Sequence, residues 1–313
     1  MKILIHNYSN ELSSEPSYLY HALARCGVET YVWADPTVSA FDVFDTVKPD
    51  VFITHAEMVT PDIVKYLKQS KNIDMAMNVS SMTDQQLKNV EDFFSDGSIN
   101  VPLVFSNNLS YKPRQKTALN LQQLLPAFDL FAITVDNKVH EPICKEAIIS
   151  QKYSKILEEF LKQEDLVDAV ESNVRNYHLV QVTRGDKSED FDIRTNVQSL
   201  QTLFRMYETI TLAGPADFCL SQMFFDSAIN AKAMSIVAED KDNFHKGLDE
   251  IFVDTDLKSD DRSEIKKEIK KQVKQRHTPF HRAATLLKHL KARDEMVKVE
   301  KFKEQLPILL KDI

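Results

Sequence analysis

Short apolar segments alternate with amphipathic segments along most of this chain, and this alternation limits the fold more than any other feature. The first cycle consists of KILIHN, a helical pattern that ends at Gly27, and ETYVWA. Further apolar segments are VFITH, IDMAMNV, VPLVFSN and DLFAITVD. Short apolar strands with helices between them are typical of a parallel sheet covered on both faces. The sequence therefore predicts an α/β fold.

Helix boundaries are marked by residues with a specific role at helix ends. Thr60 followed by Pro61 predicts a capped helix start with proline at the first position. Thr83 and Gln86 have the spacing of a capping box. Gly27 is predicted to end its helix in a left-handed conformation.

A second block of the same kind follows a charged stretch near residues 150–173 that is predicted to be helical. Its predicted strands are YHLVQVTRG, ETITLAG, AMSIVAED and EIFVD. The alternation thus predicts two α/β domains with parallel sheets, at residues 1–150 and 151–290. Residues 291–313 are predicted to form a helical tail.

The bulk composition excludes several classes of protein. No apolar run approaches the roughly 20 residues needed to span a bilayer, and the first residues lack a secretory signal pattern. The 3 cysteines are widely spaced without a CxxC pair, which argues against a disulfide framework or a zinc site. We therefore expect a cytoplasmic protein without a membrane span.

Charge is distributed unevenly along the chain. The net charge is −8, yet residues 262–293 contain eleven Lys or Arg and two Glu, and so carry about +9. One interpretation of this basic stretch is a helix face that is exposed to solvent. A basic patch that meets a phosphate-bearing partner is the alternative.

Three stretches resemble the GT-B class of nucleotide-sugar glycosyltransferases. SSEPSYLYHALARCGVETYVWAD is similar to the start of the acceptor domain, and CLSQMFFDSAINAKAMSIVAED to the donor site, where an acidic residue opens a helix. RHTPFHRAATLLKHL resembles the closing motif of the spore-maturation-type branch. The resemblance implies two Rossmann-like domains that face a cleft. It also implies that the hydroxyls and amides of the loop at residues 7–14 contact the sugar or the acceptor.

The resemblance also suggests which residues bind the donor. Asp226 stands where the family has an acidic residue that binds the ribose, although glutamate is commoner there. Ser221 and Gln222 then point at the diphosphate. Related bacteriophage DNA glucosyltransferases carry an arginine nearby, where this chain has Met223.

Two arginines and a glycine are candidates for the missing phosphate contacts. Arg184 and Gly185 follow a predicted strand, and ligands bind beyond strand ends in open α/β sheets. Arg194 is the second candidate for the missing charge. The alternative for Arg184 is a solvent-facing side chain.

An inverting transferase needs a general base near the acceptor hydroxyl. The candidates follow predicted strands of the first domain, in the order of preference His55, Asp84 and Glu57. His55 is alternatively a core histidine, and Asp84 a first-turn residue that favours the helix dipole.

The sequence thus predicts a hexosyl- or pentosyltransferase that uses a nucleotide-diphosphate sugar, with UDP as the expected nucleotide and no cofactor or metal. His277 and His281 lie four residues apart, but no third ligand has matching spacing. The acceptor is a glycan, a protein or a modified DNA base; DNA would explain the basic stretch and YKPRQK at residues 111–116. The alternative is a non-catalytic protein that binds a nucleotide or a partner through a decayed site.

Overall fold

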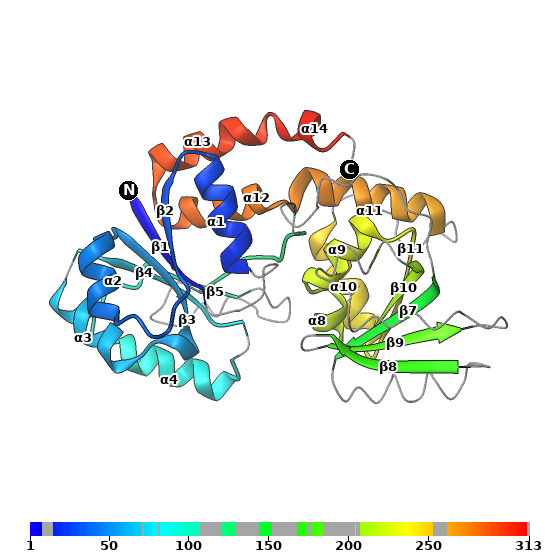
Figure 1. The fold of residues 1–313 in the computed structure, drawn as a ribbon, viewed down its shortest axis with the longest axis horizontal. Helices are drawn as coiled ribbons and strands as arrows, with labels where there is room; N and C mark the ends of the chain where they lie inside the picture. Colours follow the sequence, from blue (N-terminus) through cyan, green and yellow to red (C-terminus); the bar gives the residue numbers. More distant parts are fainter. Residues whose placement is uncertain are drawn as a thin grey trace. The chain divides into compact units, whose positions relative to one another are not determined.

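The computed structural model divides the chain into two compact units (Figure 1). The first unit comprises Met1–Pro126 and Thr278–Asp312, and the second comprises Ala127–His277. The structure describes residues 1–7, 15–70, 72–80, 82–106, 121–128, 130, 144–151, 168–174, 177–183, 204, 207–252 and 262–311. In these residues, no helix has both the length and the apolar character needed to cross a membrane.

The first unit contains a six-stranded sheet in which all neighbouring strands are parallel, so the predicted α/β fold with a parallel sheet is confirmed. The order is β2-β1-β3-β4-β5-β6. The strands are β1 (Lys2–His6), β2 (Glu29–Trp33), β3 (Val51–His55), β4 (Asp74–Asn78), β5 (Leu103–Ser106) and β6 (Leu121–Gln123). The sequence did not indicate β6, which has three residues.

Seven helices of the described residues belong to this unit. They are α1 (Glu15–Arg25), α2 (Ala40–Val47), α3 (Pro61–Gln69), α4 (Asp84–Phe94), α12 (Pro279–His289), α13 (Arg293–Lys303) and α14 (Leu306–Leu309). Figure 1 shows α2, α3 and α4 together, and one apolar core joins their buried side chains to the strands. That core contains Phe44, Ile63 and Leu87 from the helices, with Phe52 and Met77 from β3 and β4.

Local capping signals identified helix ends correctly. Thr60 caps α3 through its hydroxyl, which accepts a hydrogen bond from the Ile63 N–H, and Pro61 is the first residue of the helix. Thr83 and Gln86 form the predicted capping box at the start of α4. Gly27, which follows α1, has a φ of 71°, the left-handed conformation predicted for it.

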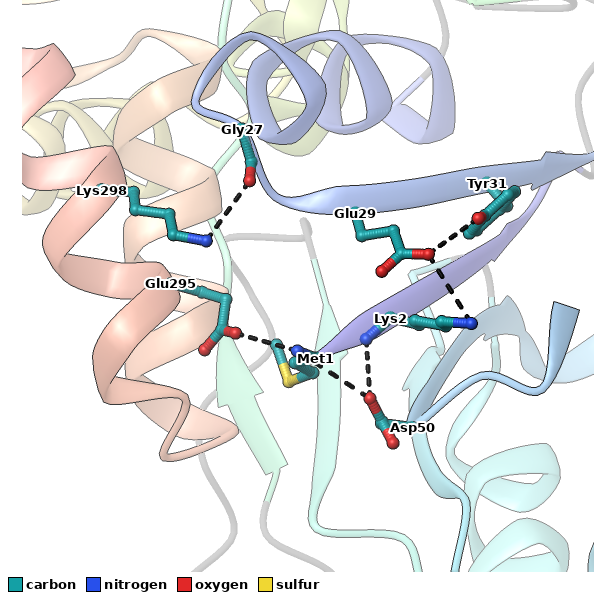
Figure 2. A network of polar contacts seen from close by, with 8 residues as sticks. All are labelled: Met1, Lys2, Gly27, Glu29, Tyr31, Asp50, Glu295 and Lys298. Atoms are coloured by element: carbon teal, nitrogen blue, oxygen red, sulfur yellow. Dashed lines mark hydrogen bonds and ion pairs between the residues drawn. The ribbon is translucent and has the colours of Figure 1, made fainter.

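A polar network joins α13 to the amino end of β1 (Figure 2). The amino group of Met1 lies 3.1 Å from the Glu295 carboxylate and 4.0 Å from the Asp50 carboxylate. Lys298 Nζ donates a hydrogen bond of 3.3 Å to the Gly27 carbonyl oxygen. These contacts, together with the packing of α12 on α1, place Thr278–Asp312 in the first unit rather than beyond a second domain.

The second unit contains a mixed sheet, whereas the sequence predicted a parallel one. Its five strands have the order β11-β10-β7-β9-β8, and only β7, β10 and β11 run parallel. The strands are β7 (Cys144–Gln151), β8 (Asp168–Val174), β9 (Tyr177–Thr183), β10 (Tyr207–Gly214) and β11 (Ala233–Ala238). The helices are α8 (Ala216–Cys219), α9 (Gln222–Asn230), α10 (Lys241–Ile251) and α11 (Arg262–Arg276).

Several boundaries in this unit differ from the sequence-based ranges. The second unit begins at Ala127 rather than near residue 150, because β7 pairs with β9 and β10. The stretch predicted to be helical up to residue 173 contains β8, which pairs antiparallel with β9. EIFVD was predicted as a strand, but Ile251 ends α10 and the Phe252 N–H closes that helix on the Leu248 carbonyl oxygen. Except for Leu130, the predicted strand DLFAITVD lies outside the described residues.

A buried arginine binds Pro126, the last residue of the segment Met1–Pro126. Arg282 on α12 is 6% exposed, and its Nε and Nη2 atoms donate hydrogen bonds of 3.1 and 2.6 Å to the Pro126 carbonyl oxygen. In the second unit, the Phe128 N–H donates to the His277 carbonyl oxygen at 3.2 Å. The chain passes between the units after Pro126 and after His277. On each side of these two points, a hydrogen bond joins residues of the same unit: Arg282 to Pro126 in the first, and Phe128 to His277 in the second.

We expect Arg282→Met to lower the free energy of unfolding of the first unit by roughly 2–4 kcal/mol, because a buried carbonyl loses two charged donors. Urea denaturation followed by the fluorescence of Trp33, the single tryptophan of the chain, measures this loss. The control is Arg293→Met, which replaces an exposed arginine of α13. Equal stability of the two variants would contradict the structural role of Arg282.

Candidate functional site

The order of the strands in the first sheet indicates where a ligand binds. From β1, the chain moves to β2 on one side and then to β3 on the other side. In open parallel sheets, ligands bind beyond the carboxyl ends of the strands at such a switch point. His6 ends β1 and His55 ends β3, and because His6 shares a face of the sheet with Thr54, the side chain of His55 points to the opposite face.

His6 is held in one orientation by two contacts. Its ring stacks on Trp33 with centroids 4.4 Å apart and an interplanar angle of 11°. Its Nδ1 atom lies 3.1 Å from the Thr54 hydroxyl, and that hydroxyl donates to the His55 carbonyl oxygen at 3.4 Å. The hydroxyl has one proton, so if it donates to the carbonyl its oxygen accepts from the ring, and on this basis we assign the imidazole proton to Nδ1. Nε2 of His6 is then a hydrogen-bond acceptor.

Burial keeps His6 neutral. The residue is 6% exposed, and desolvation lowers its pKa from 6.5 to about 4. At neutral pH, the ring therefore presents a lone pair on Nε2 rather than a positive charge. A base with this tautomer is suited to accept a proton from a hydroxyl group.

His55, the first-ranked candidate base, has the opposite tautomer. Its Nδ1 atom accepts a hydrogen bond of 3.3 Å from the Glu57 N–H, so the proton of the neutral ring is on Nε2. Burial lowers the pKa of His55, while the Glu57 carboxylate, 3.9 Å from Nδ1, raises it. In this state, His55 acts as a base only if Nδ1 releases the Glu57 N–H.

The other polar groups at this edge have different exposures. The Glu57 side chain is 51% exposed and therefore accessible to a ligand. Asn78 and Ser106, at the ends of β4 and β5, are buried. Asn78 pairs in register with His55 across β3 and β4, and its side-chain oxygen accepts from the Ser80 N–H at 2.9 Å. Asp84, the second-ranked candidate base, is the first residue of α4, and its side chain lies outside the described part of the structure.

The predicted donor residues of the second unit are described only in part. Arg184, Gly185 and Arg194 lie outside the described residues. Ser221 caps α9, since its hydroxyl accepts from the Met223 N–H at 3.3 Å.

Asp226 lies in the second turn of α9 rather than at its start, where the resemblance had placed the acidic residue. It is 1% exposed, and Gln222 Nε2 donates to its carboxylate at 3.4 Å.

Two other kinds of chemistry have little support in the described residues. In these parts of the chain, His, Cys, Asp and Glu side chains form no group of three or more that would hold a metal ion. Burial and the charge of Glu239 raise the pKa of Cys219 to about 12, so its thiol is protonated at neutral pH. The imidazoles at the switch point are therefore the best-defined reactive groups.

Comparisons with known protein families, with curated proteins and with solved structures found no match for this chain. Its function is thus inferred from its own geometry. Sequence reasoning selected His55 but missed His6, although the polar pair His6–Asn7 directly follows the apolar run ILI at the end of the first predicted strand. That polar ending was the available signal.

The low pKa of His6 makes the first unit sensitive to acid. A histidine whose folded pKa is lowered contributes its stability fully above the unfolded pKa of 6.5, and this stability is lost as the pH falls toward about 4. We expect His6→Phe, which preserves an aromatic ring against Trp33, to reduce the stability lost between pH 7 and pH 4 by up to about 3 kcal/mol.

Urea titrations at several pH values, followed by Trp33 fluorescence, measure this difference. His245→Phe on the exposed side of α10 is the control, because it belongs to the second unit. Stability curves of wild type and His6→Phe that run parallel from pH 7 to pH 4 would show that His6 titrates normally.

Proposed function

We propose that this chain is a GT-B-like glycosyltransferase that moves a sugar from a nucleotide-diphosphate sugar to an acceptor hydroxyl. The observation that carries the proposal is the Nε2 acceptor of His6 at the β1/β3 switch point, oriented by Thr54 and Trp33. The donor substrate supplies the activated sugar, so the reaction requires no separate cofactor. UDP is the nucleotide that we expect, and the acceptor is a glycan, a protein or a modified DNA base.

In this proposal, His6 is the general base. The acceptor hydroxyl gives its proton to Nε2 of His6 while its oxygen forms a bond to the anomeric carbon of the sugar. The bond from that carbon to the diphosphate oxygen breaks, and the nucleoside diphosphate leaves with the electron pair. Proton transfer makes a buried imidazolium, which burial disfavours. The negative charge of the departing diphosphate offsets that cost because opposite charges raise the pKa of a histidine.

The second unit supports the donor side of the proposal through its parallel strands. β7, β10 and β11 have their carboxyl ends at one edge, and Gly214 at the end of β10 has a φ of 153°. The chain then continues through α8 to Ser221 and α9. A strand that leads into a helix start near a sheet edge is a common arrangement for binding phosphates.

One observation favours the alternative, a non-catalytic nucleotide-binding or partner-binding protein. Asp226 is 1% exposed and accepts a hydrogen bond from Gln222. A carboxylate in that position binds a ribose only if the start of α9 rearranges. Nucleotide binding without transfer is the outcome that distinguishes this alternative.

A thermal-shift panel of nucleoside diphosphates and nucleotide sugars tests the proposal. We expect uridine nucleotides to raise the stability by about 2.7 kcal/mol when present at one hundred times their Kd. Wild-type protein should also release nucleoside diphosphate from the sugar donor in the presence of acceptor, and His6→Phe should lose this activity while still binding the nucleotide. A flat panel at millimolar ligand would contradict the donor assignment.

Asp226→Asn tests the ribose contact separately. We expect it to weaken nucleotide binding by roughly 1–3 kcal/mol, because the ribose loses a charged acceptor. Isothermal titration calorimetry measures the change. Unchanged affinity would mean that Asp226 is a structural residue of α9 and would favour another ribose-binding group.

A further inference from the structure

We propose that the outer edge of β2 pairs antiparallel with the same edge of a second copy of this chain, about a twofold axis at Tyr31. The six-stranded sheet of the first unit then continues into the sheet of the second copy. This inference does not depend on the proposed glycosyl transfer. It follows from the main-chain groups that β2 presents, from its exposed side chains and from the charges at its two ends.

The main chain of β2 has hydrogen-bonding groups at its outer edge. This strand lies at the end of the sheet order, and in the described part of the chain its only strand partner is β1. The Asn7 N–H donates to the Trp33 carbonyl oxygen at 2.8 Å, so the main chain of Trp33 faces β1. Successive residues of a strand direct these groups to alternate sides, so Tyr31 also faces β1, whereas Thr30 and Val32 face outward. Thr30 and Val32 therefore present their N–H and C=O groups at the outer edge.

These outward groups are complementary to the same groups of a second copy. With a twofold axis at Tyr31, Thr30 of one copy lies opposite Val32 of the other, and each such pair exchanges both of its N–H···O bonds. Tyr31 then lies opposite Tyr31 of the second copy, with the Cβ atoms about 4.5–5.5 Å apart. Because both copies make the same contacts, the association closes as a dimer.

The side chains of β2 also favour pairing. Tyr31 and Val32 are each 39% exposed, and among the exposed large hydrophobic side chains of the described residues they are the only ones in a strand. β2 has no proline, lysine or bulge, which are features that protect edge strands from pairing. Its single charged residue, Glu29, lies 3.7 Å from Lys2 Nζ and accepts a hydrogen bond of 2.8 Å from the Tyr31 hydroxyl (Figure 2). The edge thus combines apolar side chains with a compensated charge.

Charges at the two ends of β2 select the antiparallel direction. At the amino end, the exposed Lys298 Nζ lies 3.3 Å from the Gly27 carbonyl oxygen. At the carboxyl end, the Asp35 carboxylate accepts from the Thr37 N–H at 2.9 Å and from the Thr37 hydroxyl at 2.6 Å, and these bonds lower the pKa of Asp35. Antiparallel pairing places the amino end of one β2 beside the carboxyl end of the other. Opposite charges therefore meet at both ends of the paired strands.

Analytical ultracentrifugation of the full chain over a concentration series tests the inference. We expect twice the mass of one chain, with a Kd in the micromolar range because a single pair of strands buries a small area. Tyr31→Lys and Tyr31→Glu should each weaken the dimer at least about tenfold, because each places like charges opposite one another. An equimolar mixture of the two variants should restore the dimer. The control is Phe93→Lys, which changes an exposed aromatic residue of α4 and should dimerise like wild type.

A second variant tests the main chain. Val32→Pro removes an outward N–H and no bond to β1, so it should also weaken the dimer while the first unit stays folded by Trp33 fluorescence. Wild-type protein that stays monomeric up to millimolar concentration would overturn the inference. So would a folded Val32→Pro variant that dimerises like wild type, or folded Tyr31 variants that fail to associate when mixed.

Discussion

Parallel pairing of β1 with both β2 and β3 is the constraint on which the rest of the first unit depends. In a parallel sheet, the carboxyl ends of the strands lie at one edge. The connections that follow β1 and β3 then leave on opposite sides of the sheet. Polar residues that are far apart in the sequence can therefore lie in contact at the ends of neighbouring strands, although no local sequence motif contains both of them. His6 and Thr54 are 48 residues apart and are brought to 3.1 Å by this pairing.

The sequence predicted the features that depend on neighbouring residues. Thr60 and Thr83 lie within three residues of the N–H groups that they cap, so their roles follow from spacing alone. Features that depend on distant partners were missed. The antiparallel pairing of β9 with β7 and β8 does not follow from apolar runs, because such runs specify a strand but not its direction. The bond from Arg282 to Pro126 spans 156 residues.

The contrast between local signals and distant partners also explains why the sequence identified His55 but not His6. His55 was identified because it directly follows an apolar run, which is a local signal. The difference between a proton donor and a proton acceptor depends on which ring nitrogen is already bonded, and those partners are the Glu57 N–H for His55 and the Thr54 hydroxyl for His6. Thr54 lies on a neighbouring strand, so this assignment required the register of the sheet.

Burial has the same consequence for the charge of both imidazoles. Burial keeps both rings neutral, and neutral rings lose less free energy on desolvation than charged ones would. The same burial makes protonation of His6 costly until a negative charge arrives nearby. In the glycosyl transfer that we propose, the departing diphosphate supplies that charge, and proton transfer to His6 then depends on the presence of the donor.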